Sequence, residues 1–353
     1  MNKQFHNSFK LNGKSFSEVL TLLHFSKSIS EEVYTFLKKW FDETEFVEVK
    51  TSGSTGKPKT IQLKKEFMKN SALATGAFFN LKENITALLC MSPNYIAGKM
   101  MLVRALELGW QLDVIEPTSN PLNYLNKTYD FSAMVPLQLH NSLNEVYKIK
   151  KLIVGGGVVS NELLSKIQNI ETEVFATYGM TETITHIAVK QLNKLRYSKL
   201  VSESHYQVLP NINISQDSRG CLVIDAPEIT SEKIITNDLV ELISENEFKW
   251  LGRFDSIINS GGVKLIPEQI EEKLSSIISE RFFVTGFQDA VLGEKLVLIV
   301  EGVKNKAILN KVKTLKTLSK FEKPKEIYFL NSFIETPTKK INRPKTAGLL
   351  NIN

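Results

Sequence analysis

A loop rich in hydroxyl groups and glycine, residues 51–59, carries the clearest chemistry in the sequence. It reads Thr-Ser-Gly-Ser-Thr-Gly-Lys-Pro-Lys. Backbone N–H groups in such a loop can converge on an anion, and the hydroxyls and a lysine add further donors, so we expect a polyphosphate ligand. A Walker A motif does not fit, because Gly53 and Gly56 lie too close together and Pro58 follows the lysine. The alternative interpretation is a plain Ser/Gly surface turn.

A second group of polar residues lies at 176–183, which read Ala-Thr-Tyr-Gly-Met-Thr-Glu-Thr. Tyr178 offers a flat ring to a purine, and Thr181 offers a hydroxyl to a phosphate oxygen. Glu182 offers the kind of carboxylate that Mg²⁺ accepts together with phosphate oxygens. The alternative is a polar turn between a strand and a helix, with Thr181 as the helix N-cap. Upstream, a strand-like run ends in three glycines: Gly155, Gly156 and Gly157.

Five motifs in this order resemble those of the adenylate-forming superfamily of acyl-CoA synthetases and adenylation domains. Two are the segments above. The other three are Trp-Leu-Gly-Arg-Phe-Asp at 250–255, Gly-Gly-Val-Lys-Leu-Ile-Pro at 261–267 and Thr-Pro-Thr-Lys-Lys-Ile-Asn-Arg at 336–343. The chain departs from the family in length, because only 50 residues precede the phosphate loop.

The resemblance implies an ATP site with Mg²⁺. The phosphate loop would supply Thr51, Ser52, Gly53, Ser54, Thr55, Gly56 and Lys57. The other members of the site would be the three glycines at 155–157, which border the adenine, and Tyr178, Gly179, Asp238 and Arg253. In the family the last two positions contact the ribose, the position of Glu182 holds Mg²⁺, and Thr181 belongs to the same signature. The family's usual Tyr-Arg-Thr-Gly before this aspartate is Ile234-Ile235-Thr236-Asn237 here, so the local match is weaker, although the carboxylate is kept.

The resemblance also implies a C-terminal domain that moves. Lys340 matches the family's catalytic lysine, while Lys339 stands where the family has glycine, so an offset of one residue stays open. Asp255 matches the hinge. Gly261 and Gly262 match a turn that lines the tunnel for the pantetheine arm of coenzyme A, where glycine lets the backbone approach a thin ligand.

Four residues in segment 91–106 are candidates for the acyl site: Tyr95, Gly98, Lys99 and Arg104. In the family the helix after this segment borders the acyl pocket. A cation on this helix suits a second carboxylate on the substrate. Surface charge on an amphipathic helix is the alternative, which fits Arg104 poorly because its neighbours are apolar. The segment and the short chain resemble the 2-succinylbenzoate–CoA ligases of menaquinone synthesis.

These resemblances predict an AMP-forming acid–thiol ligase that uses ATP, Mg²⁺ and coenzyme A. A small carboxylic acid, with 2-succinylbenzoate as the first candidate, would become an acyl-adenylate and then a CoA thioester. Two alternatives stay open. One is a different aryl- or acyl-CoA ligase or an enzyme that loads a carrier protein. The other is a non-catalytic nucleotide-binding relative, which retention of Glu182 and Lys340 disfavours.

Short apolar strands that alternate with helical segments must position these residues, and they predict an α/β fold. Strand-like runs include 46–49, 87–91, 131–135 and 151–154, and helical patterns cover 30–45, 64–79, 97–108 and 161–168. We predict a large N-terminal α/β domain, residues 1–254, of truncated adenylate-forming type, which binds ATP and the acid. A small mobile α+β lid domain, residues 255–353, would carry the catalytic lysine.

Composition narrows the function classes further. Of 353 residues, 42% are hydrophobic and 23% are charged, as in an ordinary globular protein. The net charge is +6, but the lysines are scattered, so we expect an anionic small-molecule ligand and no nucleic acid. We read no signal peptide and no membrane span, and expect a cytoplasmic protein with Cys90 and Cys221 as reduced core thiols. The oligomeric state is not predicted.

Overall fold

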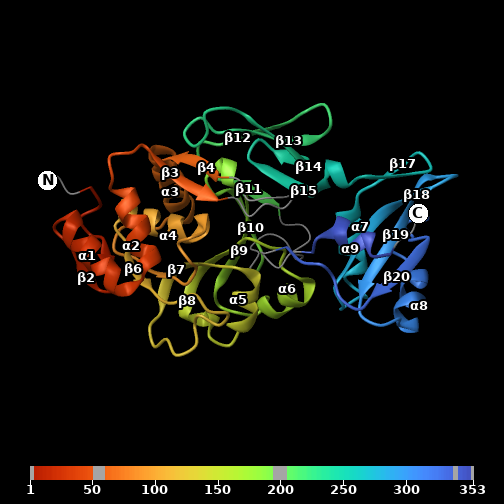
Figure 1. Ribbon diagram of the computed structural model, residues 1–353, viewed down its shortest axis with the longest axis horizontal. Coiled ribbons are helices and arrows are strands. Elements are labelled where there is room, and N and C mark those ends of the chain that lie inside the picture. The colour runs from red at the N-terminus through yellow and green to blue at the C-terminus, as the bar shows by residue number, and fades with distance from the viewer. Residues whose placement is uncertain (1–3, 51–59, 194–204, 337–340, 351–353) are drawn as a thin grey trace. The chain divides into compact units, whose positions relative to one another are not determined.

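The computed structural model describes residues 4–50, 60–193, 205–336 and 341–350 (Figure 1). The predicted phosphate loop and both candidate lysines, Lys339 and Lys340, lie outside these ranges. Contacts divide the chain into two compact units. The first comprises residues 1–214, 224–234 and 243–248, and the second comprises 215–223, 235–242 and 249–353. This division differs in detail from the predicted boundary at Asp255, which stays a prediction.

The first unit is built on a parallel sheet. Its central strands, in spatial order, are β6 (Gln111–Val114), β5 (Thr86–Leu89), β7 (Tyr129–Met134), β8 (Ile149–Val154) and β9 (Glu173–Gly179). Beyond β6, β1 (Lys10–Leu11) pairs in parallel and carries β2 (Lys14–Ser15) antiparallel at the edge. The chain passes from β5 to β6 on one side and then crosses to β7 on the other, so the strand order reverses at β5. Ligands of such sheets bind beyond the carboxyl ends of the strands at this switch point.

Helices and short antiparallel strands complete the first unit. The helices are α1 (Val19–Ile29), α2 (Glu31–Trp40), α3 (Lys65–Phe79), α4 (Ile96–Leu108), α5 (Pro136–Asn141) and α6 (Asn161–Ile167). The antiparallel strands are β3 (Phe46–Lys50), β4 (Thr60–Lys64), β10 (His186–Gln191) and β11 (Tyr206–Val208). Lys50 on β3 pairs with Thr60 on β4, so the predicted phosphate loop connects two paired strands.

The second unit contains a smaller sheet, β17 (Val263–Leu265), β16 (Ile258–Ser260), β19 (Gly293–Glu301) and β18 (Phe282–Asp289), with β20 (Glu326–Leu330) parallel to β19. Its helices are α7 (Pro267–Leu274), α8 (Lys306–Thr314) and α9 (Arg343–Gly348). Strands β12 (Asn213–Gln216), β13 (Cys221–Asp225), β14 (Ile234–Ser244) and β15 (Glu247–Arg253) neighbour one another in that order, and each unit holds a part of them.

Burial explains why the central strands of the parallel sheet could be predicted from the sequence. Strands of a parallel sheet are covered on both faces and therefore form nearly continuous apolar runs. Leu88, Met134, Leu152, Val154 and Val174 lie in one buried cluster with the helices that cover them. One helix prediction was wrong in extent. Segment 30–45 is helical only to Trp40, and Ser30 caps it by accepting the N–H groups of Glu32 and Val33.

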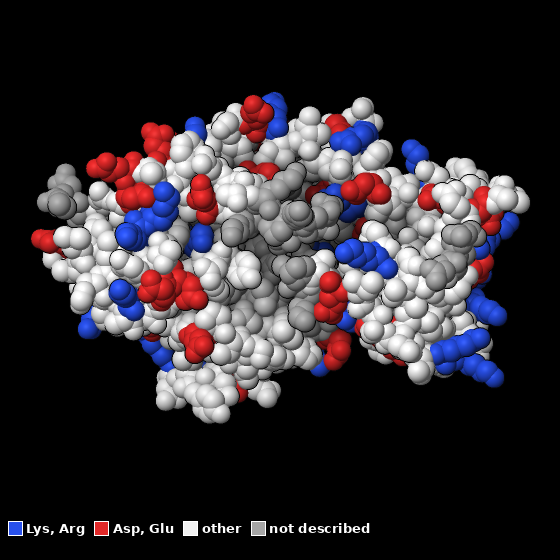
Figure 2. All heavy atoms as spheres, in the orientation of Figure 1, with Lys and Arg blue, Asp and Glu red and all other residues white. Residues whose placement is uncertain are grey.

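Both cysteines lie in the interior of the protein. Cys90 and Cys221 are buried and not disulfide-bonded, as predicted, and burial raises the pKa of the Cys90 thiol to about 12. Figure 2 shows lysine and arginine mixed with aspartate and glutamate on the face in view. Within the described ranges, no helix has the length and hydropathy needed to cross a bilayer.

Candidate active site

Tyr178 lies at the end of β9, inside a cluster of aromatic rings. Its ring centroid is 5.2 Å from that of Phe248, with planes at 78°, and 5.7 Å from that of Tyr206. The contact with Phe248 is edge-to-face, a favoured geometry for aromatic pairs. The side chain predicted to stack on a purine is therefore half-buried and packed against two other rings.

Gly179 follows Tyr178 where β9 runs closest to the start of β10. A Cβ atom at this position would lie 2.2 Å from the carbonyl oxygen of Thr185 and 2.5 Å from Cα of His186. Both are backbone atoms, which cannot swing aside as a flexible side chain can. The glycine is required for packing, whether or not its backbone also approaches a nucleotide.

We expect Gly179→Ala to destabilise the fold by about 1–3 kcal/mol, the range for inserting a methyl group into a closely packed region. The measurement is the midpoint and slope of urea unfolding. Gly348→Ala is the matched control, because a Cβ at Gly348 meets no atom within 4 Å. Equal stability of the two variants would show that β9 and β10 do not approach each other as described.

The segment after Gly179 forms a tight, strained turn. Residues Thr181–Thr183 make one 3₁₀ turn, and no α-helix follows, so the alternative reading of Thr181 as a helix N-cap is wrong. Ile184 has φ 65° and ψ −62°, and the N–H of Thr185 donates to the carbonyl of Thr183 at 2.7 Å. This is a γ-turn of the rare, strained hand, and a β-branched residue in it is an outlier.

Glu182 sits inside this turn with an exposed side chain. Among the described residues, no group of three or more His, Cys, Asp or Glu side chains could hold a metal ion. A single carboxylate does fit Mg²⁺ in a phosphate site, because this ion takes one or two protein carboxylates and completes its shell with phosphate oxygens and water.

The three glycines follow β8 at the carboxyl edge of the parallel sheet. Gly156 has φ +78°, and a Cβ at Gly155 would lie 2.5 Å from Oγ1 of Thr177 on the neighbouring strand. A Cβ at Gly156 or Gly157 would make only ordinary contacts, with Val135 and Pro136. The packing of β9 therefore requires glycine at position 155, and the predicted role of the run beside an adenine stays a prediction.

Three of the candidate acyl residues lie at the start of α4, which follows β5 at the switch point, and Arg104 lies further along the same helix. Tyr95 precedes the helix and is 63% exposed. Gly98 lets the helix pass over the preceding chain, because a Cβ there would lie 2.4 Å from the carbonyl oxygen of Ser92. The ammonium of Lys99 donates to the carbonyl of Pro93 and lies 5.6 Å above the Phe36 ring, and burial lowers its pKa.

Arg104 has a very different setting from Lys99. Its side chain is only 1% exposed. Nη2 lies 3.5 Å from Nδ1 of His186, Nη1 lies 3.9 Å from Sδ of Met101, and Nε has no hydrogen-bond partner in the described part of the chain. Burial lowers the pKa of Arg104 to about 9. Burying a guanidinium is costly unless an anion compensates its charge, and no described carboxylate does so, which makes Arg104 a candidate partner for an anionic ligand.

His186, on β10, was missed by the sequence analysis. It is 5% exposed, and its Nε2 lies 3.4 Å from Oγ1 of Thr75, which donates to the carbonyl of Ser71. Burial and the charge of Arg104 both lower the pKa of His186, so the ring is neutral and can accept from the guanidinium. An isolated histidine in the apolar run 184–189 was the available signal.

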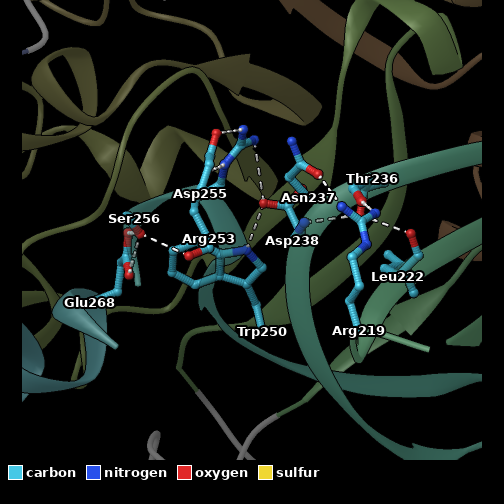
Figure 3. A network of polar contacts seen from close by, with 10 residues as sticks. All are labelled: Arg219, Leu222, Thr236, Asn237, Asp238, Trp250, Arg253, Asp255, Ser256 and Glu268. Carbon is cyan, nitrogen blue, oxygen red and sulfur yellow. Dashed lines mark hydrogen bonds and ion pairs between the residues drawn. The ribbon is translucent and has the colours of Figure 1, made fainter. Parts of the chain in front are cut away.

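In the second unit, Asp238, Arg253 and Asp255 belong to one network (Figure 3). Oδ1 of Asp238 accepts from Nε1–H of Trp250 at 3.2 Å and lies 3.7 Å from Nη1 of Arg253. The guanidinium of Arg253 also donates to both oxygens of Asp255, which lowers the pKa of that carboxyl group. The predicted ribose residues and the predicted hinge are thus joined by side-chain contacts.

Gly261 and Gly262 form the two-residue connection between β16 and β17, where Ser260 pairs with Val263. Their φ angles are +59° and +81°. A two-residue hairpin with both central residues at positive φ strongly favours glycine. Turn geometry alone therefore accounts for the pair, and the predicted role in a CoA tunnel stays a prediction.

Known proteins resemble this chain in sequence and in fold. Residues 50–215 match the model of a family described as AMP-binding enzyme. The crystal structure of an acyl-CoA synthetase (AMP-forming)/AMP-acid ligase II-like protein from Dyadobacter fermentans is 38% identical, with a TM-score of 0.60, over 92% of this chain and 97% of that one. The chain belongs to the AMP-binding enzyme family. The predicted superfamily is thereby confirmed.

More distant AMP-binding enzymes cover the chain as well. A 2-succinylbenzoate–CoA ligase from Bacillus cytotoxicus is 26% identical over 85% of this chain and 69% of that protein. An O-succinylbenzoate coenzyme A synthetase from Bacillus subtilis, solved in complex with ATP and magnesium ion, is 20% identical with a TM-score of 0.71, over 95% of this chain and 83% of that one. The predicted α/β fold of adenylate-forming type is confirmed, while the roles of single residues remain predictions.

Proposed function

We propose that this AMP-binding enzyme is an acid–CoA ligase that converts 2-succinylbenzoate to its CoA thioester, in two steps that consume ATP. Relatives named for this activity match 82–95% of the chain. The observation that carries the choice of acid is Arg104. It is a buried cation on the helix after β5, with no ion pair to an acidic group among the described residues. A substrate with two carboxylates can present one to the nucleotide and the other to this guanidinium.

In the first step, a carboxylate oxygen of the acid attacks the α-phosphorus of ATP. A P–O bond forms to the acid, the bond to the β-phosphate breaks, and pyrophosphate leaves. Charge grows on the phosphoryl oxygens, so loop donors and Lys340 would stabilise the transition state by position and charge. Glu182 would hold Mg²⁺, which when bound neutralises phosphate charge.

In the second step, the sulfur of the CoA thiol attacks the acyl carbon of the adenylate. The C–O bond to AMP breaks, AMP leaves, and the thiol proton passes to solvent. Rotation of the C-terminal domain about Asp255 would withdraw Lys340 and bring Gly261 and Gly262 toward the acyl group. Such a rearrangement between half-reactions is one form of hinge closure.

The test measures pyrophosphate release and thioester yield with MgATP, with and without CoA. We expect both products with 2-succinylbenzoate, and much weaker activity with 4-oxo-4-phenylbutanoate, which lacks the ring carboxylate. Pyrophosphate without thioester would instead support an enzyme that loads a carrier protein. No turnover with any acid in a broad screen would contradict the proposal.

A further inference from the structure

A half-buried tryptophan contacts the carboxylate proposed to bind ribose. Only 7% of Asp238 is exposed. Its Oδ1 accepts the indole N–H of Trp250 at 3.2 Å, and the same oxygen lies 3.7 Å from Nη1 of Arg253. Figure 3 shows the indole nitrogen and the guanidinium reaching this oxygen from different directions. These two contacts bring a neutral donor and a cation to the same carboxylate oxygen.

The guanidinium of Arg253 hydrogen-bonds mainly to Asp255 and not to Asp238. Nε and Nη2 of Arg253 donate to the two oxygens of Asp255 at 3.0 and 2.9 Å, which is the forked geometry that suits a guanidinium. Its approach to Asp238 is the longer contact. Of the residues drawn in Figure 3, Trp250 donates the hydrogen bond to the Asp238 carboxylate.

The backbone of Asp238 is anchored independently of Trp250. Its N–H donates to Oγ1 of Thr236 at 3.0 Å, and that hydroxyl donates to the carbonyl of Leu222 at 2.8 Å. Arg219 donates to the carbonyl of Thr236 at 3.0 Å and to Oδ1 of Asn237 at 2.9 Å. Loss of the indole N–H should therefore loosen the orientation of the Asp238 carboxylate without releasing the strand that carries it.

We propose that Trp250 is a positioning residue for nucleotide recognition. Its indole N–H holds the Asp238 carboxylate in the orientation that accepts the ribose hydroxyls of ATP, and so sets the preference for ATP over 2′-deoxy-ATP. This inference rests on the proposed role of Asp238 as the ribose contact. It does not depend on which acid the enzyme uses.

The experiment compares binding of the magnesium complexes of ATP and 2′-deoxy-ATP by calorimetry, without any acid. Trp250→Phe keeps most of the ring and removes the donor. It should weaken ATP binding about 3- to 10-fold, the scale of one hydrogen bond, and weaken 2′-deoxy-ATP binding less. Trp40→Phe is the control, because it makes the same change at a buried tryptophan outside this network, on α2. It should leave the ratio of the two affinities unchanged.

A double-mutant cycle separates positioning from general damage. Asp238→Ala should abolish the preference for ATP, and Trp250→Phe added to it should cause no further loss, because both residues act through one carboxylate. Equal weakening of both nucleotides by Trp250→Phe would overturn the inference, as would a further loss in the Asp238→Ala background. A preference that survives Asp238→Ala would refute the ribose contact itself, and the inference with it. Lack of acid turnover would count only against the proposed reaction.

Discussion

Lys340→Ala should slow formation of the acyl-adenylate by about 10²-fold or more, the scale for one preorganised charge donor at a transition state. Negative charge builds on the phosphoryl oxygens in this step, and an ammonium group opposes it. Thioester formation from pre-made acyl-adenylate should largely survive, because that step develops no new phosphoryl charge. The two half-reactions are measured separately, as pyrophosphate release and as thioester yield.

Lys339→Ala is the matched control for this prediction. The two lysines are adjacent, and only one corresponds to the family's catalytic position. Lys339→Ala should have a mild effect on both half-reactions. The reverse result would move the assignment by one residue, and equal losses in both half-reactions for Lys340→Ala would contradict a lysine that acts in one step only.

Arg104→Ala should reduce kcat/KM for 2-succinylbenzoate about 10- to 100-fold, since a hydrogen-bonded charge pair contributes roughly 1.5–3 kcal/mol. The loss should lie mainly in KM for the acid, with KM for ATP little changed. The value of kcat/KM for the analogue 4-oxo-4-phenylbutanoate should be almost unchanged by Arg104→Ala. Equal losses for both acids would indicate damage to the buried site around α4 instead of a lost contact.

The same arginine predicts a pH dependence. Burial lowers the pKa of Arg104 to about 9 in the free protein, so kcat/KM for the diacid should fall as the pH rises through about 9, and the monoacid should lack this descending limb. Stability should change in the opposite direction. In the unfolded chain Arg104 keeps its proton to higher pH than in the folded protein. Deprotonation of the buried side chain therefore increases the free energy of unfolding as the pH rises above about 9. A pH profile shared by both acids would count against the assignment.

Local patterns predicted the parts of the fold that local physics determines. Buried strands such as β7 and β8 are nearly continuous apolar runs, and α3 and α4 keep helical spacing over their length. Strand β9 was missed, because most of its residues are only half-buried and its sequence lacks such a run. Helix α1 was also missed, since polar residues interrupt its apolar face.

The candidate site was predictable where a motif is contiguous and unpredictable where contacts join distant segments. The segment holding Tyr178 and Glu182 could be read directly from the sequence. The contact between Arg104 and His186 spans 82 positions, and the contact between Trp250 and Asp238 spans 12 positions across two strands. No local periodicity encodes such pairs, because they depend on sheet order and on the register of neighbouring strands.

The γ-turn at Ile184 bears on how this protein can change over generations. A backbone held in such a conformation costs on the order of 1–3 kcal/mol, which the surrounding packing must offset. Ile184 is only 1% exposed, so a glycine that relieved the backbone would also remove buried apolar surface. A substitution that relaxed the turn would shift Glu182, two residues earlier. With Glu182 in its proposed role at Mg²⁺, selection for stability and selection for placement of this carboxylate oppose each other at the turn, as in other stability–activity trade-offs.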